Sequence, residues 1–101
     1  MTVQSLDKEN FKDMKDIAII KFTAPWCAPC KQLAPIYEEV SNEIKSNFFE
    51  VDIDKEQDIA KEFGVMSVPT IIILKQNSEV LRITGTMPKE QLKNKILSKI
   101  Q

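Results

Sequence analysis

The segment at residues 17–22 restricts the fold of this chain more than any other stretch. It runs IAIIKF and is apolar at every position except Lys21. A strand that is apolar on both faces is usually covered on both sides, as in the parallel sheets of α/β proteins. We therefore expect a central, buried strand here. Lys21 is anomalous in such a strand, because a buried charge needs a partner.

The patterns that follow alternate between helix and strand. Leu33, Tyr37, Val40 and Ile44 form one apolar stripe of a helix, and Gly64 is suited to end a second helix in the left-handed conformation. The first predicted element is a short helix capped by Ser5, with Leu6, Phe11 and Met14 on its apolar side. Further helices are predicted at 28–44 and 56–63, and inner strands at 48–53 and 71–74. A hairpin turn at 76–79 then leads into another strand, and Pro88 opens the last helix. This order predicts an α/β sheet with helices on both faces and a right-handed first crossover.

Length and charge narrow the function classes. A chain of 101 residues suits a single domain, which we place at 1–101. The net charge is −1 without a basic block, so neither nucleic acid nor an anionic membrane is an expected partner. The N-terminus lacks the pattern of a secretory signal, and the apolar runs are too short to span a bilayer. We therefore expect a cytoplasmic protein in a reducing environment.

Two cysteines, Cys27 and Cys30, are separated by Ala28 and Pro29. As a structural disulfide, so short a loop would contribute only about 2 kcal/mol, against about 4.7 kcal/mol for a 100-residue loop. As a zinc site, the pair would need two more ligands, and the chain contains no histidine. Asp52 and Asp54 resemble a metal-binding pair but suit a solvated strand end better. We therefore predict no metal and favour a redox-active pair.

The redox interpretation agrees with the local pattern. A strand is expected to end near Thr23 and a helix to begin near Cys27. The unpaired N–H groups and positive dipole at a helix N-terminus favour thiolate over thiol, so Cys27 is the candidate nucleophile. Cys30, one turn inward, would be shielded and would resolve a mixed disulfide. Pro29 restricts the loop between the two sulfurs.

The surrounding residues resemble the thioredoxin family over nearly the whole chain. The pattern A-x-W-C-x-P-C-K is present as Ala24, Trp26, Cys27, Pro29, Cys30 and Lys31. The remaining elements of the family follow in its order, as Pro35, the D-I-D at 52–54, the V-P-T at 68–70, and Gly85.

This resemblance implies a thioredoxin fold, with a central mixed sheet of four to five strands flanked by about four helices. It implies a monomeric protein-disulfide reductase that binds no cofactor, maintains cell redox homeostasis and is recharged by an NADPH-dependent flavoprotein, thioredoxin reductase. Pro69 would be cis and would pack against the disulfide. Val68 would offer its backbone to an extended segment of a disulfide-containing target protein. Trp26, Met66 and Gly85 would border that docking surface, although core filling is the simpler interpretation of Met66 and Val68.

The sequence departs from the family at five places. Thr23 stands where the family usually has a tryptophan ahead of the motif. Ala28 stands where most members have glycine, and the turn at 76–79 lacks the usual glycine and is one residue longer. Lys21 occupies a position where the family usually buries an aspartate, whereas Glu50 replaces its usual lysine. We predict that Lys21 and Glu50 pair beneath the disulfide. Glu50, or water ordered by the pair, would then assist Cys30.

A cationic Lys21 would also stabilise nearby thiolate and make the couple more oxidising. In the simpler interpretation Lys21 extends to solvent and Glu50 is an ordinary surface charge. Two other functions fit the same residues. One is an oxidant or isomerase of the same fold, and the other is a non-catalytic subunit that binds a partner through the surface around Trp26 and Pro69.

Overall fold

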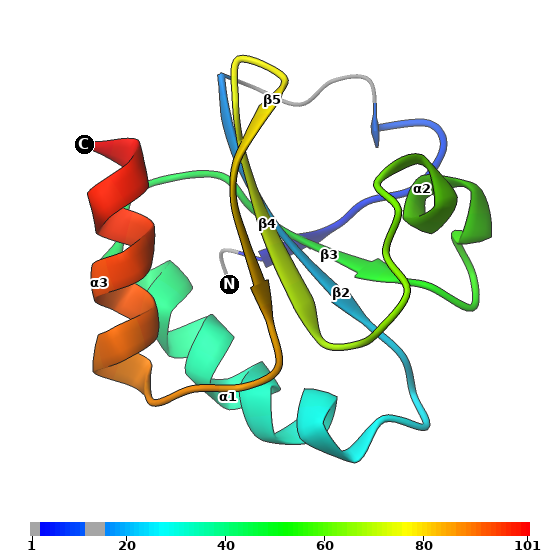
Figure 1. Ribbon diagram of the computed structural model, residues 1–101, viewed down its shortest axis with the longest axis horizontal. Coiled ribbons are helices and arrows are strands. Elements are labelled where there is room, and N and C mark those ends of the chain that lie inside the picture. The colour runs from blue at the N-terminus through cyan, green and yellow to red at the C-terminus, as the bar shows by residue number, and fades with distance from the viewer. Residues whose placement is uncertain (1–2, 12–15) are drawn as a thin grey trace.

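The computed structural model describes residues 3–11 and 16–101 (Figure 1). Within these residues there are five strands, β1 (Val3–Ser5), β2 (Ile17–Thr23), β3 (Phe48–Asp52), β4 (Thr70–Lys75) and β5 (Ser78–Thr84), and three helices, α1 (Ala28–Glu43), α2 (Gln57–Glu62) and α3 (Lys89–Ile100). The strands form one sheet in the order β1-β3-β2-β4-β5. β3 pairs in parallel with β1 and β2, whereas β4 is antiparallel to both β2 and β5.

The central position of β2 follows from its composition. Its middle five residues are buried, and it pairs with β3 on one side and β4 on the other. Because side chains alternate across a strand, Ile19 faces one core and Ile20 faces the other. The mixed sheet and its inner strands confirm the predicted fold class.

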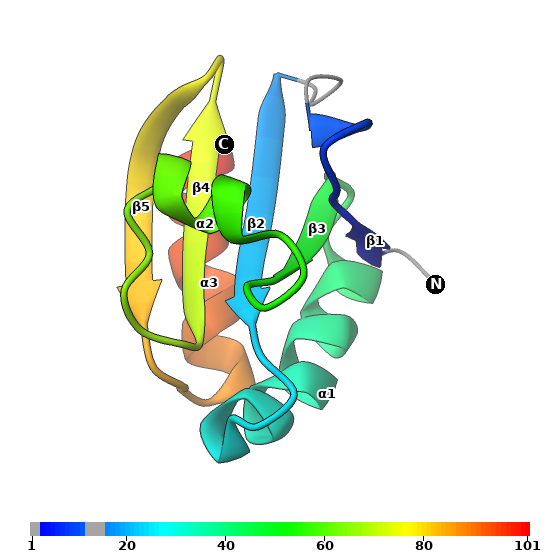
Figure 2. The same cartoon turned by 90° about the vertical axis from the view of Figure 1, so that its right-hand side faces the viewer.

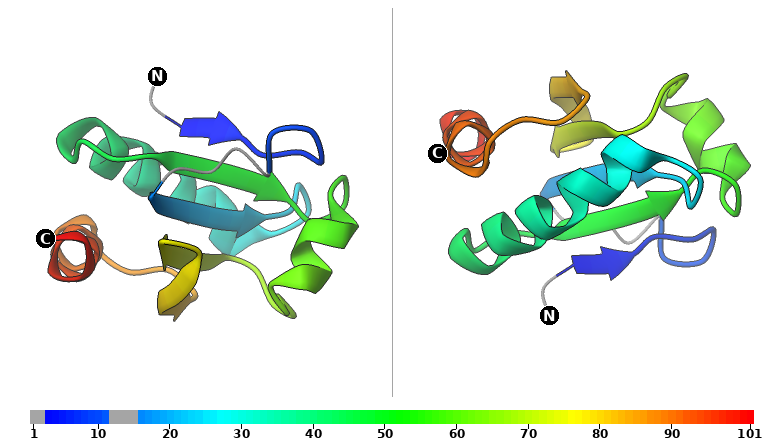
Figure 3. Two further views of the ribbon diagram at one scale, coloured as in Figure 1. Left: turned by 90° about the horizontal axis from the view of Figure 1, so that it is seen from above. Right: turned by 90° about the horizontal axis from the view of Figure 1, so that it is seen from below.

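Helices cover both faces of the sheet. The stripe of α1 packs with α3 against one face, in a core of Ile19, Leu33, Tyr37, Val40, Phe48, Ile71, Ile73, Leu92 and Ile96. The other face packs against α2 and the segment after β1, in a core of Leu6, Ala18, Ile20, Phe22, Phe49, Val51, Ile59, Ile72 and Leu74. Figure 2 shows α2 in front of the sheet and α3 behind it. In both views of Figure 3, α2 and α3 lie at opposite ends of the molecule.

The N-terminal segment differs from the prediction. Ser5 is not a helix cap but the last residue of β1, paired with Glu50. Instead, the side chain of Asp7 accepts hydrogen bonds from the backbone N–H groups of Glu9 and Asn10, and so organises a turn. Three helices are therefore described rather than about four. Met14, placed in the predicted helix, lies outside the described residues.

The β4–β5 hairpin turn is also shorter than predicted. Only Gln76 and Asn77 form it, both with positive φ (52° and 67°), and Ser78 already belongs to β5. The additional residue is accommodated inside the ladder instead. Ile73 pairs with Leu81 while Leu74 pairs with Glu79, which leaves Val80 as a bulge.

Candidate redox site

The two cysteines lie where the chain passes from β2 into α1. Cys27 is the N-cap residue of α1 and has an extended backbone conformation. Its Sγ atom accepts a hydrogen bond from the backbone N–H of Cys30 at 3.2 Å. Pro29 fits the first turn because its missing N–H has no partner to lose there. Cys27 and Cys30 are joined by a disulfide, with their Cα atoms 5.2 Å apart.

The disulfide is buried beneath a loop from the other half of the sheet. Only 4% of Cys27 and 2% of Cys30 are exposed, and Val68 packs against the buried cluster that they form with Ala24. The Val68–Pro69 peptide bond is cis, as the family resemblance implied. The carbonyl oxygen of Val68 lies 3.6 Å from the Sγ atom of Cys27. The loop is anchored by Gly85, whose N–H donates to the carbonyl of Pro69 at 2.9 Å.

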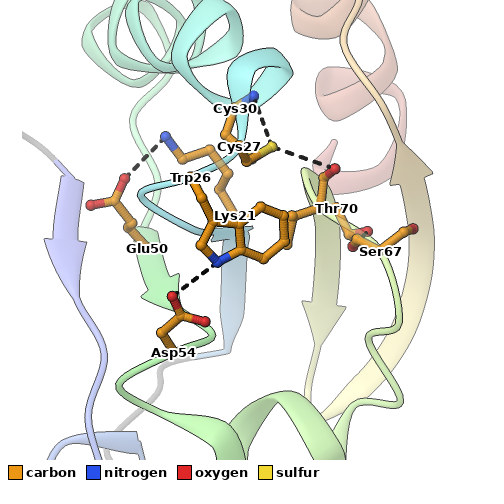
Figure 4. The surroundings of a disulfide bond; sticks show 9 residues. Lys21, Trp26, Cys27, Cys30, Glu50, Asp54, Ser67 and Thr70 are labelled. Atoms are coloured by element: carbon orange, nitrogen blue, oxygen red, sulfur yellow. Dashed lines mark hydrogen bonds and ion pairs between the residues drawn. A yellow bond between two sulfur atoms is a disulfide. The ribbon is translucent and has the colours of Figure 1, made fainter.

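Two exposed apolar side chains lie on loops next to this site. Trp26 is 67% exposed and Met66 is 98% exposed, so core filling is excluded for Met66. Val68 is half-buried and packs into the core as well as against the disulfide. The indole N–H of Trp26 donates to the Oδ2 atom of Asp54 at 3.0 Å (Figure 4). The sequence predicts only a solvated strand end at Asp54, and nothing in its spacing from Trp26 indicates this bond.

The ion pair expected between Lys21 and Glu50 is present. These residues are direct neighbours on β2 and β3, and the Nζ atom of Lys21 lies 3.0 Å from the Oε1 atom of Glu50. The Lys21 side chain is only 3% exposed, whereas that of Glu50 is 39% exposed. An extension of Lys21 to solvent is therefore wrong. Figure 4 shows the lysine side chain reaching toward Glu50 from below the two cysteines.

A pocket of about 240 Å³ connects this ion pair with the second cysteine. Lys21, Cys30 and Glu50 all contribute to its walls, together with Thr23, Ala24, Pro25, Lys31, Ala34 and Asp52. Pro25, Lys31 and Ala34 are exposed, so the pocket reaches the surface of the protein. Water can therefore approach Cys30 from the side on which Glu50 lies.

Tyr37 completes the surroundings of Lys21. The sequence predicts Tyr37 only as part of the apolar stripe of α1, yet its ring centroid lies 5.0 Å from the Nζ atom of Lys21. Burial raises the pKa of Tyr37 well above its usual value, and the nearby Glu50 carboxylate acts in the same direction. The hydroxyl therefore remains protonated. The sequence did contain a sign of this contact, because the apolar stripe of the helix includes a tyrosine and the buried strand includes a lysine.

An N-cap cysteine, a second cysteine three residues later and the carbonyl of a cis Val68–Pro69 bond next to the first sulfur are the arrangement expected of a thiol–disulfide exchange site. A sequence model of the family described as Thioredoxin matches residues 2–98. The chain belongs to the thioredoxin family. It is accordingly a protein dithiol–disulfide oxidoreductase that works through a redox-active cysteine pair rather than a bound cofactor. Among residues 3–11 and 16–101, His, Cys, Asp and Glu side chains form no group that could hold a metal ion.

Several relatives resemble this thioredoxin-family chain over most of its length. Thioredoxin H4 of Arabidopsis thaliana is 42% identical over 98 residues, which cover 95% of this chain and 79% of that protein. A thioredoxin of Staphylococcus saprophyticus is 35% identical over 96 residues, covering 91% of this chain and 92% of that protein.

Solved structures agree with these relatives. A mutant thioredoxin from Halobacterium salinarum superposes with a TM-score of 0.90 at 25% identity, covering 98% of this chain and 91% of that one. Thioredoxin NaTrxh from Nicotiana alata gives a TM-score of 0.86 at 31% identity, covering 96% of this chain and 91% of that one. In the part of the chain that is described, no helix combines the length and apolar character needed to cross a membrane.

Proposed function

We propose that this chain, acting as a single monomeric domain over residues 1–101, reduces disulfides in target proteins, with Cys27 as nucleophile and Cys30 as resolving thiol. The observation that supports these roles best is the position of Cys27 at the N-cap of α1. Free N–H groups and the helix dipole there stabilise a thiolate on Cys27. Cys30 lies inside the first turn and is slightly more buried.

The reaction proceeds in two exchanges. The Cys27 thiolate attacks one sulfur of the target disulfide, forms a mixed disulfide and releases the other target sulfur as a thiolate that takes a proton from water. Cys30 then gives its proton to Glu50 or water and attacks the sulfur of Cys27, which forms the Cys27–Cys30 bond and releases the second target sulfur as a thiolate that takes a proton from water. The target thus gains two electrons and two protons, and the cysteine pair becomes oxidised.

Docking of the target involves the surface around the disulfide. Trp26 and Met66 offer exposed apolar side chains, and the Val68 carbonyl lies beside the Cys27 sulfur. The hydrogen bond from the Gly85 N–H to the Pro69 carbonyl supports this loop. An extended segment on either side of the target cysteine would pair with the backbone of Val68, as in strand addition. Ala28 and Pro29 fix the geometry of the loop that the target approaches.

Lys21 and Glu50 adjust proton transfer and charge at Cys30. Both residues line the pocket that also contains Cys30. Glu50, directly or through water in this pocket, accepts the proton that Cys30 loses. The Lys21 ammonium stabilises negative charge on the sulfurs and so makes the couple more oxidising.

The partners follow from the family. Disulfide-containing proteins are the targets, and a flavoprotein thioredoxin reductase returns two electrons from NADPH to the cysteine pair. We place the protein in the cytoplasm, where the glutathione and thioredoxin systems keep the targets reduced. Redox homeostasis of the cell is the resulting role.

Insulin reduction in a reductase-coupled assay tests the proposal, with consumption of NADPH as the readout. Cys27→Ser should abolish turnover, whereas Cys30→Ser should accumulate a mixed disulfide between Cys27 and the target. Activity of Cys27→Ser would contradict the assignment of the nucleophile. A reduction potential near that of thioredoxin, about −270 mV, supports a reductant, whereas a value close to about −120 mV would indicate an oxidant instead.

A further inference from the structure

The charged end of Lys21 is held from two sides. The Oε1 atom of Glu50 lies 3.0 Å from the Nζ atom, and the ring centroid of Tyr37 lies 5.0 Å from the same atom. A cation over an aromatic face at this distance is attracted by the ring quadrupole, more strongly where water is excluded. Since the Lys21 side chain is 3% exposed, the tyrosine ring replaces part of the hydration that the ammonium has lost.

Tyr37 itself is fixed to the two strands that carry the ion pair. Its hydroxyl oxygen lies 2.9 Å from the carbonyl oxygen of Ile19 on β2 and 2.7 Å from that of Phe49 on β3. The ring also packs edge-on against Phe48, with centroids 5.5 Å apart. Only 1% of Tyr37 is exposed, so this ring has a single defined position relative to Lys21.

Without that ring the Lys21 ammonium could move into a neighbouring pocket. A pocket of about 240 Å³ opens beside Lys21 and reaches exposed residues of α1. Long lysine side chains readily move their ammonium groups toward water while leaving the aliphatic part buried. The carboxylate of Glu50 is partly exposed and able to follow such a movement.

We propose that Tyr37 is a positioning residue for the redox reaction: its ring keeps the Lys21 ammonium beside Glu50, on the wall of the pocket shared with Cys30. Tyr37 does not touch the sulfurs or the target, and it acts through Lys21. The inference therefore rests on the proposed function of Lys21 in adjusting charge at the cysteine pair.

A double-mutant cycle on the redox equilibrium tests this role. The equilibrium constant for oxidation of the Cys27–Cys30 dithiol by oxidised glutathione is measured for the parent, Tyr37→Leu, Lys21→Met and the double variant. Tyr37→Leu should raise this constant by about two- to fivefold in the parent, because the displaced cation no longer stabilises thiolate. In the Lys21→Met background the same substitution should leave it unchanged. Tyr37→Phe, which retains the ring, should keep the parental value.

Two results would overturn the proposal. One is an equal change in both backgrounds, since Tyr37 would then act independently of Lys21, and the other is no change in the parent. Should Tyr37→Leu fail to fold, the unmodified protein provides a second measurement. The ε-methylene protons of Lys21 should resonate upfield of their random-coil position because of the tyrosine ring current, and an unshifted resonance would equally contradict the proposal.

The same set of proteins separates this inference from the proposed function. Insulin reduction by the parent tests the reductase, and the difference between the parent and Lys21→Met tests charge adjustment by Lys21. An effect of Lys21→Met on the equilibrium, without an effect of Tyr37→Leu, refutes only the role of Tyr37. No effect of Lys21→Met refutes the function proposed for Lys21, and with it the inference.

Discussion

At the scale of single residues, the charge near the disulfide depends on one ion pair, between Lys21 and Glu50. Lys21 is a buried cation in a strand whose other buried residues are apolar, and Glu50 is its partner on the neighbouring strand. A buried charge that loses its partner is strongly destabilising, because its desolvation is no longer offset. Breaking this pair should therefore destabilise the protein, and the role proposed for the pair at Cys30 can be tested with the same substitution.

Glu50→Gln tests both contributions, since it removes the charge while keeping the size of the side chain. We expect the free energy of unfolding to fall by about 1–3 kcal/mol, less than for a fully buried pair because Glu50 is partly exposed. We also expect slower insulin reduction, measured between pH 6 and about pH 9.

The double variant Lys21→Met/Glu50→Gln is the matched control. It removes both charges and should recover much of the lost stability in urea unfolding, while insulin reduction stays slow. If Glu50→Gln reduces insulin at the parental rate at every pH, Glu50 has no role in proton transfer.

At the scale of elements, α1 and α3 are tied together by charges at their surfaces. Glu43 on α1 pairs with both Lys89 and Lys93 on α3, and Glu39 is 3.6 Å from Lys89. Hydrogen bonds from Lys89 and Lys93 lower the pKa of Glu43. A carboxylate with a lowered pKa in the folded state stabilises the protein above its unfolded pKa and loses this effect as the pH falls.

Glu43→Gln should therefore make the free energy of unfolding less sensitive to a fall in pH. Below about pH 5 the urea midpoint of the parent should decline more steeply than that of the variant, because the unfolded parent binds a proton at Glu43 that the folded protein, with its lowered pKa there, does not yet hold. Glu62→Gln on α2 serves as a control with the parental slope. Parallel declines for parent and Glu43→Gln would show that the pairing contributes nothing.

The β4–β5 hairpin offers a stability prediction of another kind. Asn77 lies in the turn with φ 67°, a conformation in which glycine has no steric penalty. Asn77→Gly should raise the free energy of unfolding by about 0.5–1 kcal/mol in urea titrations. The same replacement at the exposed Asn94 of α3 should lower it by about 0.5–1 kcal/mol. Destabilisation by Asn77→Gly would contradict this account of the turn.

At the scale of the whole molecule, the site is assembled from separate parts of the chain. The cysteines come from the β2–α1 junction, Met66 and Pro69 come from the loop before β4, and Gly85 follows β5. The sheet order brings β2 and β4 side by side, so these loops meet at one edge of the molecule. The exposed apolar surface there is available to a protein substrate.

Met66→Ser tests the docking surface without disturbing the core. Since Met66 is 98% exposed, stability should change by less than about 0.5 kcal/mol. The KM for insulin should rise about three- to tenfold with little change in kcat, because apolar contact with the target is lost. Val80→Ser, at the bulge of β5, is the control and should keep the parental KM. An unchanged KM for Met66→Ser would remove Met66 from the docking surface.

The order of inner strands and helices was predictable because burial leaves a clear pattern in the sequence, a nearly continuous apolar run in residues 17–22 and a helical stripe in α1. The N-terminal segment was not, since Ser5 suits a helix cap and a strand equally well and only pairing with Glu50 decides between them. The turn length was also misjudged, because an extra residue in a hairpin enters either the turn or the ladder. Here Ile73 pairs with Leu81 and Leu74 pairs with Glu79, so the extra residue lies in the ladder.

The sequence alone determined the fold class, the redox pair and the presence of two charges of exchanged sign, since these follow from composition, spacing and family pattern. Only the tertiary structure decided where those charges lie and what surrounds them. The distance between Lys21 and Glu50, the pocket shared with Cys30 and the ring of Tyr37 over the ammonium all depend on β2, β3 and α1 packing together. A one-dimensional pattern specifies which face a side chain occupies, whereas its partner on that face is set by register and helix packing.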